Sequence, residues 1–294
     1  MKIDIEYQHP DYENNVNRWE FYLRSYMGGA EYQDGNYLTS YLNEDKNSYS
    51  RRIQLTPIDN HCRNVIHVYS SFLWRIPPTR NYNGLDGSPA LEAFIGDANL
   101  DGQSFDSFMR EAQIWSSVYG HVWVMVDKPQ STAGTRAEEL DQGIRPYVTL
   151  LSPENVYDWK WERQPSGRFQ LSYLKVREAI DRVDGTTTIT YFREWTKDTI
   201  KLTRYDGAES EVIEVLDNPI GLIPAAYLPA NRSMVRGIGI SDISDISYMQ
   251  KAIYQELSEI EQLIRISNHP TLVKTYETDA SAGAGAVINM PEDI

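Results

Sequence analysis

The stretch SDISDISYMQKAIYQELSEIEQLIRIS (241–267) determines how the rest of the chain can be arranged. Ser241 can cap a helix at its start, and Asn268-His269-Pro270 ends it. A helix over 241–267 would be roughly 39 Å long. Its apolar residues share one side and form a seam, consisting of Ile243, Ile246, Ile253, Leu257, Ile260 and Ile264. The spacing therefore predicts a long helix that is apolar along one side only.

The side of this helix away from the seam is polar, and Lys251, Gln255, Glu259 and Gln262 lie there. Complete burial of the six seam residues would stabilise the fold by roughly 10 kcal/mol. The other helices that the sequence predicts are shorter and have apolar faces of their own to bury. We therefore expect the long helix to project from the body, with few contacts to residues 1–235 beyond its first turns. Its seam would pack against a neighbouring subunit, or against a second long helix of a longer protein.

The first part of the chain is predicted to be helical. Apolar residues recur at helical spacing in four segments, which are 12–26, 56–72, 88–95 and 104–119. Thr56 is the expected cap of the second helix, with Pro57 at its first position. The apolar face of that helix should consist of Ile58, Cys62, Val65, Tyr69 and Phe72.

The middle of the chain is predicted to be a β-sheet. HVWVMV (121–126) has the composition of a buried strand, and between Arg145 and Leu216 apolar and polar residues alternate. Asp184-Gly185 and Asp206-Gly207 are typical hairpin turns. We therefore expect an α+β fold, with N-terminal helices packed on an antiparallel β meander.

Composition limits the possible functions. The chain has 294 residues, 28 Lys and Arg against 42 Asp and Glu, and a net charge of −14. Tight binding of a particular DNA sequence is disfavoured, because it needs clustered basic residues. The single cysteine, Cys62, allows no disulfide within the chain, and no run of 18 apolar residues predicts a membrane span.

Three motifs could indicate catalysis or ligand binding, and each is incomplete. Asp97-Ala-Asn-Leu-Asp-Gly102 resembles the start of a calcium loop, but Phe108 stands where the bidentate Glu should be. Arg236-Gly-Ile-Gly-Ile-Ser241 lacks the third glycine of a dinucleotide loop, so a hinge before the long helix is favoured. His61 and His67 are six apart and cannot share a metal on one helix face. We predict no catalytic residues, no metal site and no cofactor.

Further motifs follow one another along the chain in a fixed order. Trp19, Tyr22, Tyr26 and Gly28-Gly29 lie on and after the first predicted helix, and SFLWRIPP (71–78), LDGQSFDSFMREA (100–112) and YGHVWVMVDKP (119–129) come next. RPYVTLLSPENVYDW (145–159) stands at the entry to the predicted sheet, and NPIGLIP (218–224) precedes the long helix. This order of motifs resembles that of the portal proteins of tailed bacteriophages.

This resemblance implies a domain organisation. Residues 1–240 would form the wing domain, 241–267 the first stem helix, and 268–294 the beginning of a small α/β clip domain. The chain would then correspond to the N-terminal part of a portal subunit. Lys251, Gln255, Glu259 and Gln262 would be candidates to face the channel, and the six seam residues would contact other stem helices.

The resemblance also implies a function. A portal is a structural protein that forms a homo-oligomeric, dodecameric ring at one capsid vertex of the virion, after assembly in the host cytoplasm. Double-stranded DNA passes through it without sequence specificity during packaging and ejection. Its partners would be the major capsid protein, the terminase packaging motor and a head-to-tail adaptor, and it would be no enzyme.

Two alternatives remain open from the sequence. The aromatic residues and paired acids could belong to a carbohydrate-active enzyme or carbohydrate-binding module. Trp19 and Trp115, however, fall on apolar helix faces, which favours packing in the core. The chain could also be another structural protein of the phage head–tail junction.

Overall fold

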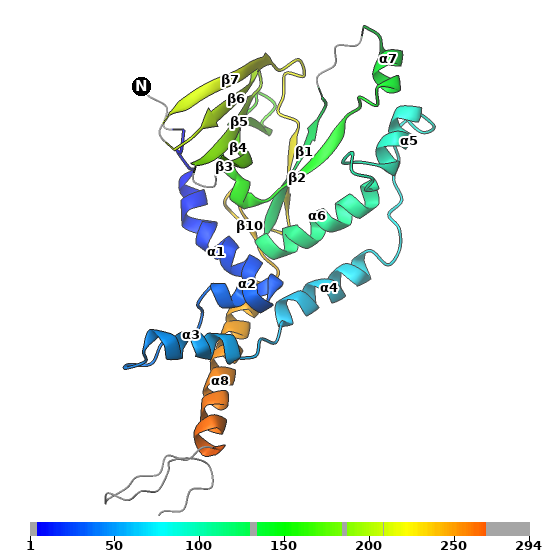
Figure 1. Cartoon of the computed structure of the whole chain (residues 1–294). Coiled ribbons are helices and arrows are strands. Elements are labelled where there is room, and N and C mark those ends of the chain that lie inside the picture. Colours follow the sequence, from blue (N-terminus) through cyan, green and yellow to red (C-terminus); the bar gives the residue numbers. More distant parts are fainter. Residues whose placement is uncertain (1–4, 130–133, 184–186, 208, 269–294) are drawn as a thin grey trace, which may run out of the picture.

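The computed structural model of the chain describes residues 5–129, 134–183, 187–207 and 209–268, and its class is α+β, as the sequence predicts. Six helices come first (Figure 1), and they are α1 (Pro10–Met27), α2 (Gly29–Asp34), α3 (Lys46–Leu55), α4 (His61–Leu73), α5 (Pro89–Gly96) and α6 (Phe105–Tyr119). The short helix α7 (Arg136–Asp141) and one 3-10 turn, η1 (Pro153–Asn155), lie among the strands, and α8 (Ser244–Asn268) is last.

The predicted meander forms a five-stranded antiparallel sheet in the order β3-β4-β5-β6-β7. Its strands are β3 (Val156–Arg163), β4 (Phe169–Val183), β5 (Thr187–Thr196), β6 (Thr199–Tyr205) and β7 (Ser210–Asp217). The turn Asp206-Gly207 joins β6 to β7, and the Asp206 side chain accepts a hydrogen bond from the Glu209 amide at 2.8 Å. The other predicted turn, at Asp184-Gly185, lies outside the described residues.

A second sheet departs from the prediction of one continuous meander. The strand β1 (His121–Asp127) lies between β2 (Tyr147–Leu151) and β8 (Ala225–Pro229), and both pairings are antiparallel. The central strand is buried over most of its length. Because β1 needs partners on both edges, β2 pairs with it rather than with β3. A two-stranded ribbon of β9 (Asn231–Arg232) and β10 (Gly239–Ile240) then leads to α8.

The main core lies between these sheets and α1. Trp19 of α1, Trp123 of β1 and Trp159 of β3 are each at most 3% exposed and belong to one apolar cluster. A second cluster joins α1, α4 and the start of α8, and Cys62 is completely buried in it. Burial raises the pKa of the Cys62 thiol to about 12, as expected for a core cysteine.

The second predicted helix differs from the structure at its start and on its buried face. Asn60, not Thr56, caps α4, because the Asn60 side-chain oxygen accepts from the Arg63 amide at 2.8 Å. Thr56 instead ends α3 and donates to the Arg52 carbonyl. Cys62 and Ile66 are buried, as is Ser70, whereas the exposed side chains of α4 include Val65, Tyr69 and Phe72.

The glycine-rich segment before α8 packs closely against the end of α6. A Cβ added to Gly239 would lie 2.0 Å from the Gly120 carbonyl oxygen, and one added to Gly237 would meet the Trp159 ring. The backbone around Gly239 is held in the β9–β10 ribbon. The glycines of this segment therefore permit close packing against Gly120 and Trp159. The sequence favoured a hinge at this position.

We expect Gly239→Ala to lower the free energy of unfolding by about 3 kcal/mol, because the methyl group would displace the Gly120 backbone. Chemical denaturation followed by tryptophan fluorescence would measure the change. Gly96→Ala is the matched control, since no atom lies within 4 Å of the added Cβ and alanine favours the helix. Equal stabilities for the two variants would contradict this account of Gly239.

Candidate functional site: the long helix and its exposed stripe

The long helix begins where the ribbon meets the end of α6. The Ser241 hydroxyl lies 2.9 Å from the Ser117 carbonyl oxygen and 2.7 Å from that of Val118. The same hydroxyl accepts from the Ile243 amide at 3.2 Å. A turn at 242–243 follows, and the helix itself runs from Ser244 to Asn268. The predicted helix is therefore confirmed, with its first residue three positions later than expected.

The buried face of α8 is mostly polar. It consists of Ser247, Gln250, Tyr254 and Ser258, none more than 2% exposed, and Ile243 in the turn before the helix is completely buried. The Gln250 amide nitrogen donates to the Ser25 carbonyl at 2.9 Å, while its oxygen accepts from the Cys62 amide at 3.0 Å. Cys62 is in the first turn of α4, where amides lack partners within the helix. Gln250 thus connects α8 to both α1 and α4 through backbone groups that would otherwise be unsatisfied.

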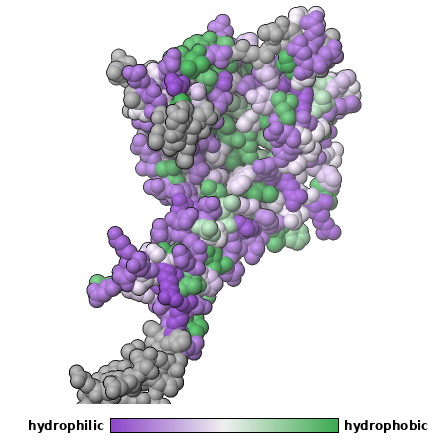
Figure 2. Space-filling model, in the orientation of Figure 1, coloured by the Kyte–Doolittle hydropathy of each residue, from purple (hydrophilic) through white to green (hydrophobic). Residues whose placement is uncertain are grey.

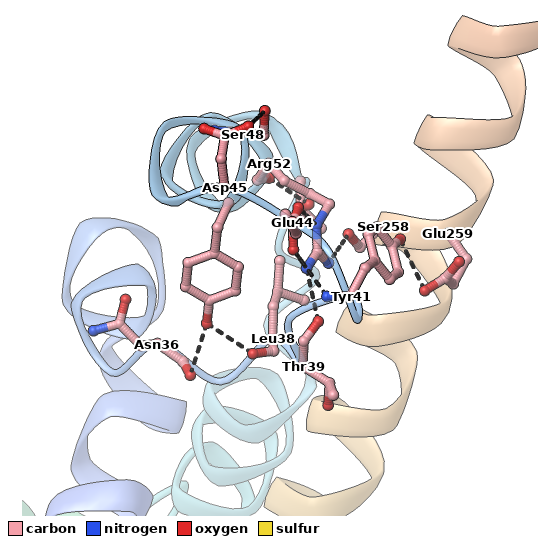
Figure 3. Close-up of polar contacts among 12 residues, drawn as sticks. Asn36, Leu38, Thr39, Tyr41, Glu44, Asp45, Ser48, Arg52, Ser258 and Glu259 are labelled. Atoms are coloured by element: carbon pink, nitrogen blue, oxygen red, sulfur yellow. Dashed lines mark hydrogen bonds and ion pairs between the residues drawn. The ribbon is translucent and has the colours of Figure 1, made fainter.

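A second anchor lies further along α8, around Arg52 of α3 (Figure 3). The Arg52 side chain is 3% exposed and binds both carboxylate oxygens of Glu44, at 2.8 and 2.7 Å. It also donates to the Ser258 hydroxyl at 3.0 Å and to the Thr39 carbonyl at 2.7 Å. The hydrogen bonds from Arg52 hold the pKa of the Glu44 carboxyl below its usual range. This cluster fixes α3 against the middle of α8.

The ring of Tyr41 completes this second anchor. The Arg52 guanidinium lies 4.1 Å from the centre of the Tyr41 ring, a distance typical of a cation–π contact. The Tyr41 hydroxyl donates to Glu259 of α8 at 2.9 Å (Figure 3). Tyr41 therefore contacts both the guanidinium of Arg52 and the helix α8, to which Arg52 is bound.

These contacts correct one expectation from the sequence. The helix does project from the sheets (Figure 1), but its contacts with residues 1–235 continue well beyond its first turns, as far as Ser258 and Glu259. The apolar seam was expected to pack against a neighbouring subunit or a second long helix. The body itself holds α8 mainly through polar residues, because those residues satisfy buried backbone groups and Arg52.

The polar residues proposed for a channel also contact the body. Lys251 lies over the Tyr37 ring, Gln255 donates to the Tyr37 carbonyl at 3.3 Å, and Glu259 accepts from Tyr41. Gln262 is half-buried. Three of the four residues thus face the connection between α2 and α3, and their role in a channel stays a prediction.

Three of the six residues of the apolar seam are exposed within the described part of the chain. Ile243 is buried and Ile246 and Leu257 are half-buried. The exposed members are Ile253 at 37%, Ile260 at 49% and Ile264 at 47%. Met249 and Leu263 add to the exposed apolar surface of α8, each at 66%. We call Ile253, Leu257, Ile260 and Ile264 the α8 stripe.

A second exposed apolar surface lies on α4 and the residues after it. We call Val65, Val68, Phe72 and Ile76 the α4 face, and their exposed fractions run from 44% to 77%. Green patches appear among the purple residues of the lower, projecting part of the molecule in Figure 2. Exposed apolar side chains concentrated on two helices are typical of protein–protein interfaces.

The motifs considered for catalysis and metals have structural roles. In the calcium-like loop, Asp97 accepts from the Gly102 amide at 2.8 Å and from Arg145 at 2.6 Å, and Asn99 accepts from the Asp101 amide. Within the described ranges no group of three or more His, Cys, Asp or Glu could hold a metal ion. His121 is buried, and loss of solvation lowers its pKa to about 3.

The tryptophan side chains do not form an exposed sugar-binding platform. Trp19, Trp123, Trp159 and Trp195 are buried, and Trp74, Trp115 and Trp161 are half-buried. All of them except Trp74 belong to the cores described above or pack against them. No helix in the described part of the chain has the length and apolar character needed to cross a membrane.

A comparison with known protein families finds no family model that matches the chain, and a search of curated proteins finds no match. The function must therefore be inferred from the order of the sequence motifs and from the geometry of α8.

We expect Glu44→Gln to lower the free energy of unfolding by about 2 kcal/mol at neutral pH, because Arg52 loses its charged partner. The folded-state pKa of Glu44 lies below its unfolded value. The carboxylate therefore stabilises the fold fully above the ordinary pKa of about 4.3, and this contribution is lost as the pH falls through the lowered value. The difference between wild type and variant should shrink towards zero on acidification.

Urea unfolding curves at neutral and acidic pH would measure this difference. Glu256→Gln removes an exposed carboxylate from α8 and is the control, with little effect expected at either pH. A Glu44→Gln effect that stayed constant as the pH fell would show that the ion pair with Arg52 is not its cause.

Proposed function

We propose that this chain is the N-terminal part of a bacteriophage portal protein, a subunit of the ring at a capsid vertex through which double-stranded DNA is packaged and ejected. The order of its motifs supports this proposal, as does an α+β body followed by a helix of 25 residues. In this proposal residues up to 240 are the wing and α8 is the first stem helix. The proposed beginning of the clip, 269–294, lies outside the described residues.

The α8 stripe is the observation on which this proposal rests. Three of its four residues are exposed and Leu257 is half-buried, although the opposite part of the helix is firmly anchored through Gln250 and Arg52. A polar anchor fixes how the helix is rotated, and it leaves an apolar surface of several turns facing outward. Contact with another subunit would remove this surface from water, and each side chain fully buried stabilises by about 1.5–3 kcal/mol.

A ring further requires that each subunit use two different surfaces. In a head-to-tail ring one patch contacts a different patch on the next subunit, and the contact repeats until the ring closes. The α8 stripe and the α4 face are two such apolar surfaces on one chain. We propose that they take part in the contacts between neighbouring subunits.

The charge of the chain suits a conduit for DNA. A net charge of −14 on each subunit multiplies on assembly, and it opposes lasting attachment of phosphates to the wall. The proposed partners are the major capsid protein, the terminase motor and the head-to-tail adaptor, and the proposed location is the virion.

We expect wild-type protein to form rings and Ile260→Asp to prevent their formation, because the aspartate would bury an unpaired charge in the subunit contact. Ile260 is 49% exposed within the chain, so the variant should lose no more than about 0.5 kcal/mol of folding stability. Ala252→Asp is the matched control, since it adds the same charge to an exposed position of α8 outside the stripe.

Light scattering coupled to size-exclusion chromatography would give the mass of each species, and circular dichroism would confirm that the body is folded. The proposal predicts rings for the wild type and for Ala252→Asp, and folded monomers for Ile260→Asp. A monomeric wild type, or rings formed equally by both variants, would contradict it.

A further inference from the structure

The strand β7 forms one edge of the five-stranded sheet. Among the described strands it pairs only with β6, so one row of its backbone groups faces away from the sheet. Val212, Ile213 and Val215 on this strand are 51%, 49% and 60% exposed. Natural edge strands are commonly protected by charged side chains, proline, a β-bulge or a covering segment. The sequence SEVIEVLD of β7 has no proline and its charged residues are all acidic, so the edge repels acidic segments and not basic ones.

The regular part of β7 adjoins a cleft. A β-bulge interrupts the pairing between Leu202 and Thr203 of β6, and from Glu214 to Asp217 the register is regular. A cleft of about 700 Å³ with a mostly apolar lining lies over the face of the sheet that carries Trp195, Ile200 and Leu216, which are neighbours on β5, β6 and β7, and it reaches β7 at Glu214 to Asp217. Leu216 of β7 and Ile220 line one part of it, and Pro129 and Pro146 line another. Figure 2 shows apolar residues at the upper edge of the body, where Figure 1 places β7.

The charge of the edge indicates what could bind there. The strand carries Glu211, Glu214 and Asp217 and no basic residue, and Glu209 directly precedes it. Lys128 and Arg193 also line the cleft, but each already has a carboxylate partner, Glu139 and Glu178 respectively. The Glu211 carboxylate is 69% exposed, and its contact with Arg204 is long, at 3.7 Å. An incoming segment with basic residues would be attracted to this edge, whereas an acidic segment would be repelled.

A second copy of β7 is therefore a poor occupant. Antiparallel pairing centred on Glu214 would place Glu214 opposite Glu214, and Glu211 opposite Asp217. Like charges directly opposite one another destabilise a strand pair.

We propose that the β7 edge and its cleft bind an extended segment of another protein that contains both basic and apolar residues, by strand addition. The backbone of the segment would pair with β7, its apolar side chains would enter the cleft beside Leu216 and Ile220, and its basic side chains would meet the carboxylates. Main-chain pairing supplies affinity, and the pockets and charges supply specificity.

A fluorescent octapeptide matched in length to β7 is the probe. It carries one valine and two lysines at every second position, so that they share the face of Glu211, Glu214 and Leu216, with threonine at the other positions. We expect it to bind the whole chain, and we expect the corresponding valine–glutamate peptide not to bind. Glu211→Lys and Ile220→Asp should each weaken binding about tenfold, a change of roughly 1.4 kcal/mol. Both positions are exposed, so both variants should fold normally.

Matched controls separate this site from nonspecific attraction. Glu162→Lys makes the same charge reversal on β3, at the other edge of the sheet, and Leu85→Asp adds the same charge at an exposed apolar residue elsewhere. Neither should change binding. Hydrogen exchange of the β7 amides should slow when the valine–lysine peptide is added, while exchange in β3 should not change.

Several results would overturn the proposal. Equal binding of the two peptides would show that charge does not select the ligand, and protection of β3 would place the contact elsewhere. Failure of the valine–lysine peptide to bind would also contradict the proposal. So would the formation of dimers in which β7 pairs with β7 of a second copy and not with the peptide. Ile260→Asp should bind the peptide like wild type, because α8 and β7 lie at opposite ends of the molecule, so this test is separate from that of ring assembly.

Discussion

The position of α8 depends on Gln250. This one side chain reaches the backbone of α1 at Ser25 and of α4 at Cys62, so three helices that are far apart in the sequence meet at a single amide group. The group is buried, and each of its two hydrogen bonds satisfies a main-chain atom that water cannot reach. Arg52 repeats this arrangement further along the helix, with Ser258, Thr39 and Glu44 as its partners. Hydrogen bonds are directional, so together they fix both the tilt and the rotation of α8.

Much of the fold follows from local signals in the sequence. Ser104 caps α6 and Gly120 ends it in a left-handed conformation, as residues of those types usually do. The alternation of apolar residues between Arg145 and Leu216 gives the strands of an antiparallel sheet. The length of α8 also follows, because one helical period continues from Ser244 to Asn268 without a breaking residue. In each case the signal lies within a few residues of the structure that it determines.

The features that the sequence did not predict depend on distant partners. Thr56 and Asn60 are both of residue types that cap helices. In the structure Thr56 ends α3, and Asn60 caps the start of α4. The helix α3 itself is too polar to show an apolar period, and it is held by the cap at Asp45 and by the contact of Arg52 with α8. The strand β2 was assigned to the meander because it alternates like its neighbours, yet its partner is β1. Periodicity indicates that a segment is a strand or a helix, but it does not identify the segment that it contacts.

The rotation of α8 shows why the face with the apolar period need not be the face that packs on the body. Turning the helix to bury the α8 stripe would cover about half of three isoleucine side chains, which would contribute roughly 1 kcal/mol each. The same turn would leave the Cys62 amide, the Ser25 carbonyl and the Arg52 guanidinium without their partners on α8. Each unsatisfied buried group costs about 1–3 kcal/mol, and a charged one costs more. The polar contacts therefore outweigh the apolar ones, and they hold the stripe outward before any partner arrives. A partner that covers the stripe would then meet a preformed surface and would lose little conformational entropy in binding it.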